Sequence, residues 1–128
     1  MKKTLNTFQL REISEALIMA WEADRLQIKI TGKALYNLVG LKRTLESELK
    51  VVGDSLALLA TQHGGEPMQN GQFKIPDDKI ADLNKALEDL YKTEVEIEYQ
   101  PIKMSEADSL PISIMEPIFD FLELTEEE

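Results

Sequence analysis

Histidine and cysteine, the residues that most often act as nucleophiles, general bases or zinc ligands, are almost absent from this chain. His63 is the only histidine and there is no cysteine, whereas a zinc site takes three or four ligands, mostly of these two types. Carboxylates are abundant, but they follow no calcium-loop pattern, and no phosphate-binding loop or nucleophile elbow occurs. We therefore expect a non-enzyme without metal or cofactor, in which His63 caps a helix C-terminus.

One locus has the chemistry to bind an anion. The candidate residues surround the predicted start of a long helix and are Lys29, Thr31, Gly32, Lys33 and Tyr36. Free backbone amides and the helix dipole favour a phosphate at such an end, and a protein that sequesters a nucleotide would use one. In the simpler interpretation, Thr31 caps the helix and the lysines balance nearby glutamates. The sequence leaves both interpretations open.

Charge and composition limit the partners. The 128 residues contain 24 Asp and Glu against 14 Lys and Arg, a formal net charge of −10, and self-repulsion opposes nonspecific binding to nucleic acid. No apolar run approaches the roughly 18 residues of a membrane span, and the lack of cysteine suits a reducing cytoplasm. Met1-Lys2-Lys3 is typical of the start of a secretion signal, but no continuous apolar segment follows, so we expect a cytoplasmic protein whose mature chain begins here.

Apolar side chains recur at three- and four-residue steps in three segments, which predicts three helices. The first spans 7–24, with Thr7 as its N-cap and Trp21 in the core. The second runs from about 32 to 63 and reaches roughly 45–50 Å, so another helix or a second copy must cover its far half. Pro76 opens the third, whose matching pattern predicts antiparallel packing on the second. The seam of the second helix supplies candidate interface residues, which are Leu41, Leu45, Val52, Leu56 and Leu59.

Two segments alternate between apolar and polar residues, as half-buried strands do. They are 26–30 and 94–99, and we expect them to pair so that Lys29 faces the glutamates of the second strand. Asn70-Gly71 predicts a small β-hairpin with a tight two-residue turn. Gly53, inside the long helix, predicts a close contact between helices.

The C-terminal part predicts one more helix. Ser113 and Glu116 have the spacing of a capping box, and Pro117 suits a first helical turn. The apolar residues assigned to this helix are Ile118, Phe119, Leu122 and Leu124, and residues 125–128 form an acidic tail that we expect to be frayed. Together, the patterns predict a single domain over 1–128 with an α+β, mostly α fold. A long-helix antiparallel hairpin, N-terminal and C-terminal helices, a small two- to three-stranded sheet and a short β-hairpin make up that fold.

Several segments in succession carry a likeness to a known family: 28–36, 45–50, 70–76, 94–97 and the proline-containing C-terminal helix. In this pattern the chain resembles small uncharacterised proteins of tailed bacteriophages and prophages of Gram-positive bacteria, from about Ile28 onward. Members often have Tyr-Gly at the end of the long helix, where this chain has His63-Gly64. The resemblance implies a phage origin and an α+β fold dominated by a helical hairpin, and it transfers no functional residue.

Two functions fit these observations. In the first, the chain is a non-catalytic accessory protein that binds other phage proteins during virion or tail assembly, a role that suits an elongated acidic helical protein. In the second, it is a counter-defence factor that binds a host immune protein or sequesters a signalling nucleotide. Either protein would act in the host cytoplasm, with homo-oligomers compatible with both. An exposed apolar stripe on the long helix favours the first function, and a basic pocket near Thr31 or an exposed acidic face with DNA-like spacing favours the second. An unrelated enzyme is the third option, and converging buried carboxylates with shifted pKa values would indicate it.

Overall fold

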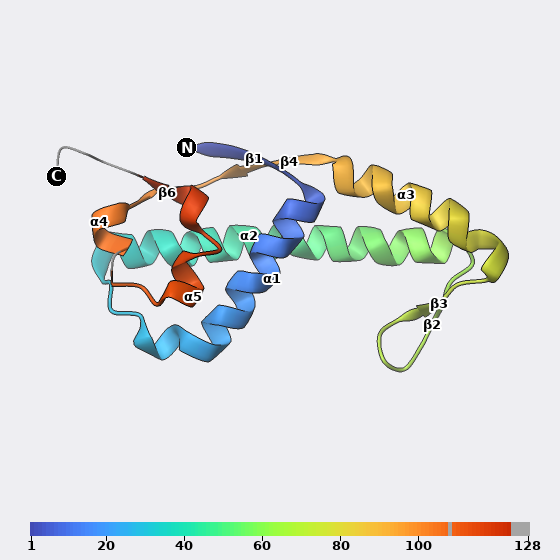
Figure 1. Cartoon of the computed structure of the whole chain (residues 1–128), viewed down its shortest axis with the longest axis horizontal. Helices are drawn as coiled ribbons and strands as arrows, with labels where there is room; N and C mark the ends of the chain where they lie inside the picture. Colours follow the sequence, from blue (N-terminus) through green and yellow to red (C-terminus); the bar gives the residue numbers. More distant parts are fainter. Residues whose placement is uncertain (108, 124–128) are drawn as a thin grey trace.

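The computed structural model describes residues 1–107 and 109–123. Its helices are α1 (Thr7–Asp24), α2 (Gly32–Gln62), α3 (Ile80–Lys92), α4 (Met104–Ala107) and α5 (Ile112–Met115), with short 3₁₀ turns η1 (Arg25–Gln27), η2 (Asp77–Lys79) and η3 (Phe119–Phe121). Its strands are β1 (Lys2–Asn6), β2 (Glu66–Pro67), β3 (Phe73–Lys74), β4 (Glu94–Glu98), β5 (Ile102–Lys103) and β6 (Leu122–Glu123). The predicted fold class, α+β and mostly α, is confirmed (Figure 1).

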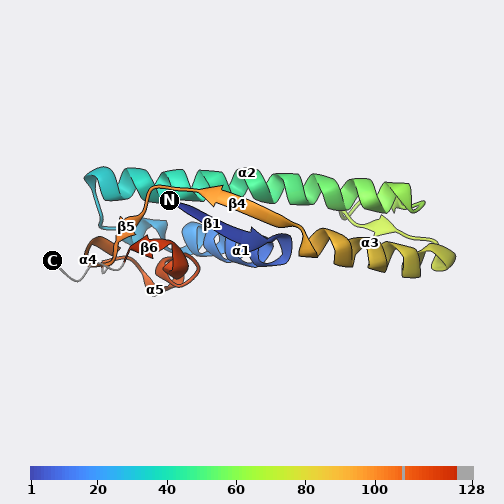
Figure 2. The same ribbon diagram turned by 90° about the horizontal axis from the view of Figure 1, so that it is seen from above.

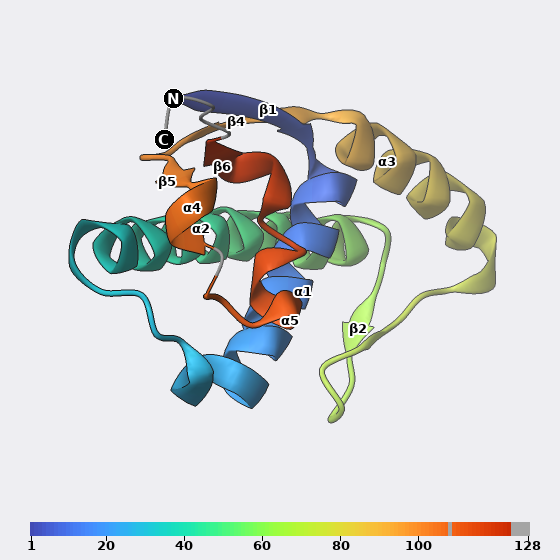
Figure 3. The same cartoon turned by 60° about the vertical axis from the view of Figure 1, so that its left-hand side comes forward.

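The long helix α2 forms one side of the molecule. Figure 2 shows the other described elements on one side of α2, with none of them beyond its opposite face. α1 crosses α2 near its middle, α3 runs antiparallel along its C-terminal part, and the C-terminal segment lies against α1 (Figures 1 and 3). The predicted antiparallel pair of helices is therefore confirmed, and the outer face of α2 is left open.

The predicted strand over 26–30 is wrong. Residues 25–27 form η1, and the side chain of Leu26 is 87% exposed. This segment turns the chain from α1 into α2, so no strand lies beside it. Its apolar alternation serves another purpose, because Ile30 is buried in the core while Ile28 packs against it from the edge.

The strand with the glutamate row does exist, and its partner is the N-terminus. β1 pairs antiparallel with β4, with Lys2 opposite Glu98 and Asn6 opposite Glu94. Lys2 thereby takes the place expected for Lys29, with its Nζ 3.4 Å from an oxygen of Glu96 and 3.8 Å from one of Glu98. On the other face of this ribbon, Leu5 and Ile97 are buried, so the pairing fixes one apolar face against the helices.

The start of α1 differs by one residue from the prediction. Asn6 is the N-cap and forms a capping box with Gln9, in which each side chain bonds the other's backbone amide. Thr7 instead fastens α1 to the end of α3: its hydroxyl donates to the carbonyl of Leu90 at 2.5 Å, and its amide donates to Thr93 at 3.0 Å. The predicted N-cap thus has a tertiary role.

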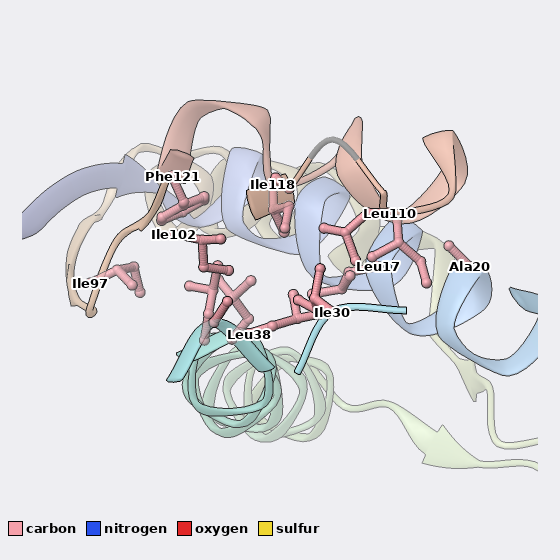
Figure 4. Close-up of a cluster of buried hydrophobic side chains, with 14 of the residues drawn as sticks. Leu17, Ala20, Ile30, Leu38, Ile97, Ile102, Leu110, Ile118 and Phe121 are labelled. Carbon is pink, nitrogen blue, oxygen red and sulfur yellow. The ribbon is translucent and has the colours of Figure 1, made fainter. Parts of the chain in front are cut away.

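The core lies where α1, α2, β4 and the C-terminal segment meet. Figure 4 shows Leu17, Leu38, Ile97 and Phe121 converging there from these four parts of the chain. Where α1 crosses α2, the buried hydroxyl of Ser14 donates to the α2 backbone at 3.4 Å. Trp21 packs against this core as expected but remains half-buried, with the Nζ of an α2 lysine, Lys42, 5.0 Å from its ring centroid.

The far end of α2 is built much as the sequence predicts. The helix ends at His63, and Gly64 has φ +76°, the left-handed conformation typical of a helix C-terminus. A short hairpin follows, in which β2 pairs with β3, but its loop has five residues, 68–72, and only Gly71 has a positive φ. The predicted two-residue turn is therefore wrong, since its common form needs positive φ at both central residues. Gly53 makes no close helix contact either, because a Cβ there would meet nothing within 4 Å.

The last α-helix of the C-terminal segment lies before Pro117, with only a short 3₁₀ turn after it, the reverse of the prediction. α5 has Pro111 as its N-cap, and Ser113 lies inside it, where its hydroxyl donates to Asp24 at 2.5 Å. A proline lacks the amide that the next helical turn would need, so the chain leaves the helix near Pro117 and continues as η3 and β6. β6 pairs in parallel with β5. Leu124 and the predicted tail over 125–128 lie outside the described residues.

Candidate functional site

The five residues predicted to bind an anion do not form one pocket. Thr31 is the N-cap of α2 by its backbone, yet its side chain makes no capping hydrogen bond, and Gly32 has φ +62°. Lys29 and Lys33 are exposed, and Tyr36 is 79% exposed. Lys33 and Tyr36 line two different depressions, with cavity volumes of about 170 and 340 Å³. The start of α2 therefore offers single groups without a shared cavity.

The depression beside Tyr36 lies between α2 and the edge of the β1–β4 ribbon. Its lining includes Asn37, Glu98 and Tyr99. Burial raises the pKa of the Tyr99 phenol above its ordinary value, and the ring packs edge-on against Phe121 with centroids 4.9 Å apart. The tyrosine is thus engaged in the core, and the depression has no cluster of cations that would recognise a phosphate.

The residues predicted as an interface belong largely to the interior. Leu41, Leu45 and Val52 are buried in the core, while Leu56 and Leu59 are half-buried. The three buried side chains are packed within the chain and cannot also contact a partner. Surfaces for a partner must therefore be sought on other faces.

The single histidine has the structural place expected for it. His63 is the C-cap of α2, and its Nδ1 lies 2.8 Å from the carbonyl oxygen of Leu59. In the part of the chain that the structure describes, no three acidic or histidine residues are grouped closely enough to hold a metal ion.

A groove between α1 and the C-terminal segment offers a concave surface for a partner. It consists of two adjoining cavities of about 450 and 220 Å³, which share Glu12, Ile13 and Asp120 in their linings. Figure 3 shows the two walls, with the C-terminal segment lying along α1. The remaining lining residues are Lys3, Thr4, Leu5, Gln9, Ala16, Ser113, Glu116, Pro117 and Phe119.

Local sequence explains how each wall is held. The capping box at Asn6 fixes the start of α1, which places Glu12, Ile13 and Ala16 along one side of that helix. The opposite wall is anchored from beneath by side chains that point into the core, while Pro117 ends the helix and turns Phe119 outward to 49% exposure. The anchoring side chains, each at most 1% exposed, are Ile114, Ile118 and Phe121.

The groove combines an apolar floor with an acidic rim. Ile13 and Phe119 present apolar surface, and the rim carboxylates of Glu12, Glu116 and Asp120 form no ion pair with any cation of the described residues. The neighbouring α1 pair is different, because the hydrogen bond from Arg11 to Glu15 at 2.7 Å satisfies both groups and raises the pKa of the guanidinium. Unpaired carboxylates beside apolar surface favour a ligand that is both basic and apolar.

The sequence patterns did not reveal this groove. Its two walls are about a hundred residues apart in the chain, at 12–16 and 113–120. One signal was available: Ile112 and Phe119 do not share one face with the buried residues of their segment, and both are exposed. Apolar side chains outside the buried set are what a docking surface would use.

No protein-family model, curated protein or solved structure matches the chain. The likeness to phage proteins therefore stays a prediction from the sequence. No helix of the described residues has the length and apolar character to cross a membrane.

Proposed function

We propose that the chain is a non-catalytic protein-binding module whose groove takes a basic and apolar segment of another protein. The observation that carries this proposal is the set of three unpaired carboxylates around the apolar surface of Ile13 and Phe119. The groove lining contains neither histidine nor cysteine, so a nucleophile with an adjacent imidazole base cannot form there. Recognition through charge and apolar contact is the role that we propose for this lining.

The parts of the groove contribute unequally. Burying one large apolar side chain of the partner contributes about 1.5–3 kcal/mol, whereas each exposed ion pair contributes roughly 0–1 kcal/mol. The apolar contact with Phe119 therefore sets most of the affinity. The carboxylates set orientation and the rate of association, and their effect weakens as salt rises.

The biological setting follows from the sequence resemblance. We place the chain as a cytoplasmic accessory protein of a tailed phage, with a virion or tail protein as its partner. The same groove serves a counter-defence factor if the partner is a host immune protein. Sequestration of a nucleotide receives less support, because Lys33 and Tyr36 line separate depressions.

A display library of random peptides tests the groove without a purified partner. Selection on the immobilised chain is expected to enrich peptides with Lys or Arg beside Leu or Phe. Phe119→Glu should abolish their binding, and Glu116→Lys with Asp120→Lys should weaken it most at low salt, because attraction of the basic peptide is replaced by repulsion. The matched control is Glu88→Lys with Asp89→Lys, two exposed carboxylates of α3 outside the groove. Peptides that bind the groove variants and the control equally would place the binding surface elsewhere.

Affinity purification from infected cells then separates the two roles. Partners that the wild-type chain captures and the Phe119→Glu variant does not are the relevant ones. Tail, connector or capsid proteins among them support assembly, and a host immune protein supports counter-defence. Capture by both forms alike would count against the groove.

A further inference from the structure

The outer face of α2 carries an exposed stripe that none of the other described elements covers (Figure 2). Its residues recur at steps of three and four, so they lie on one side of the helix. Three large apolar side chains stand on it, with exposed fractions of 79% for Tyr36 and 58% for both Val51 and Leu58. The whole stripe, all exposed, is Tyr36, Gly40, Arg43, Ser47, Val51, Asp54 and Leu58.

This stripe is complementary to itself when reversed about Ser47. In an antiparallel pair centred there, Tyr36 stands opposite the partner's Leu58, eleven positions from the centre in each chain. Arg43 then lies within one turn of the partner's Asp54, and the symmetry makes this ion pair twice. A parallel pair would instead set Arg43 beside the partner's Arg43, and like charges in contact are unfavourable. Charge thus selects the antiparallel orientation.

The low net charge and the small residues of the stripe also suit a second copy. The chain has a formal net charge of −10, but this stripe holds one cation and one anion, and the adjacent Lys33 and Lys50 are exposed. Repulsion between two copies is therefore weak here. Gly40 and Ser47 are small, and a Cβ at Gly40 would meet nothing within 4 Å, so nothing prevents close approach of a second helix.

We infer that the chain forms a two-fold symmetric dimer in which the outer faces of two α2 helices pack antiparallel about Ser47. The contact runs from Tyr36 to Leu58, about 33 Å at 1.5 Å per residue. The groove between α1 and the C-terminal segment lies on the other side of α2 and stays open in each copy (Figure 2). The dimer would thus present two grooves, and it does not depend on what they bind.

Single-cysteine trapping tests the geometry, because the natural chain has no cysteine. Helix axes 8–10 Å apart with Cα radii of 2.3 Å bring two facing Cα atoms to about 3.4–5.4 Å, which overlaps the range that a disulfide spans. Ser47→Cys should therefore cross-link on mild oxidation. Gly40→Cys should not cross-link alone, but should do so when mixed with Asp54→Cys. Gln69→Cys, in the β2–β3 loop, controls for random collision.

A charge swap gives a second, independent measurement. Arg43→Asp and Asp54→Arg alone should each weaken self-association by about tenfold or more in sedimentation velocity, and the double swap should restore it. Both side chains are exposed, so folding is unaffected, and circular dichroism checks this. A wild-type chain that stays monomeric at millimolar concentration overturns the inference. Cross-linking of Gly40→Cys by itself at the rate of Ser47→Cys overturns the antiparallel geometry.

Discussion

The two ends of α2 have the same apolar periodicity and very different burial. We call residues 1–52 and 93–123 the body and residues 53–92 the arm. Every residue of the buried hydrophobic cluster lies in the body, whereas Ala60 is the only buried residue of the arm. In α3, which has a regular apolar stripe, no residue is fully buried. A helical pattern therefore shows which face turns inward, and the number of packed layers decides how far that face is buried.

The physical reason is the absence of a third element over the arm. In the body, α1 and the C-terminal segment cover α2, as Figure 4 shows. In the arm, α1 reaches only the C-terminal end of α3, and the rest of α3 packs on α2 without a third helix over the pair (Figure 1). The arm is held to the body mainly at the end of α3, where Arg11 donates to the hydroxyl of Tyr91 at 2.8 Å and Phe8 packs edge-on against the Tyr91 ring. Segments with few buried contacts open at lower free energy than the core.

The largest expected effect is that of a cavity in the body. Leu45→Ala removes a side chain that is 1% exposed, and a cavity at such a site costs about 2–5 kcal/mol of the free energy of unfolding. Urea denaturation followed by circular dichroism measures this. An unchanged midpoint would show that α2 is not covered here.

The next largest effect is expected at Gly65, at the far end of the arm, where α2 has ended. A Cβ on Gly65 would lie 2.6 Å from the carbonyl oxygen of Ala60 and 2.7 Å from Cδ1 of Ile75. Gly65→Ala should therefore cost about 1–3 kcal/mol, in the range of overpacked sites. Hydrogen exchange should show faster opening confined to the arm. Equal acceleration in α1 would mean that arm and body unfold as one unit. Gly40→Ala, at an open position, is the control.

The arm counterpart of Leu45 is Leu87, in α3. The sequence places both positions in the apolar seam of the helical hairpin. An alanine substitution at either one is therefore predicted to lower the free energy of unfolding by a few kcal/mol. Leu87 is only half-buried, so Leu87→Ala should cost about 1 kcal/mol, near half the value for burying a leucine fully. The same urea experiment compares the two variants. A loss for Leu87→Ala as large as that for Leu45→Ala would remove the distinction between arm and body.

What the sequence predicts well is local. The three long helices, the stop at Gly64 and the short hairpin all follow from spacing within one segment. The partner of β4 does not, because β1 lies about 90 residues away and, with Lys2 and Lys3, has no clear apolar alternation. The segment 26–30 carried a stronger alternation than β1 does. Which strand pairs with β4 depends on the fold of the whole chain. The local alternation therefore predicted 26–30 as the partner, where the structure has β1.

The candidate groove could not be predicted from the sequence either, because it also depends on contacts between segments that are far apart in the chain. Glu116 and Pro117 were interpreted as the start of a helix, and in the structure they mark the end of one. That single reversal places Phe119 on the rim and Ile118 and Phe121 inside. The predicted interface leucines were correctly assigned to one seam, but a seam pattern cannot say whether the chain itself or a partner covers it.

A stabilising change tests the boundary between the two regions. Gly53 lies inside α2 at the first residue of the arm, and a Cβ there would meet nothing within 4 Å. Gly53→Ala should raise the free energy of unfolding by up to about 1 kcal/mol through helix propensity. If the arm opens separately, hydrogen exchange should slow more in the arm than in the body. Slower exchange in both regions alike would indicate one cooperative unit.

The smallest expected effect concerns the ion pairs of the body's surface. Lys2 lies near two glutamates of β4, but its side chain is 59% exposed, and such pairs contribute roughly 0.2–1 kcal/mol. Lys2→Glu replaces attraction by repulsion beside Glu96 and Glu98, so its cost should be greatest at low salt and shrink as salt screens the row. Lys85→Glu makes the same charge change on the exposed surface of α3 and serves as the comparison in the arm. Thermal unfolding at two ionic strengths compares the two variants. A salt-dependent loss of stability for Lys2→Glu alone means that β1 is held partly by charge. Equal losses would mean that the apolar face of Leu5 and Ile97 holds the ribbon without help from Lys2.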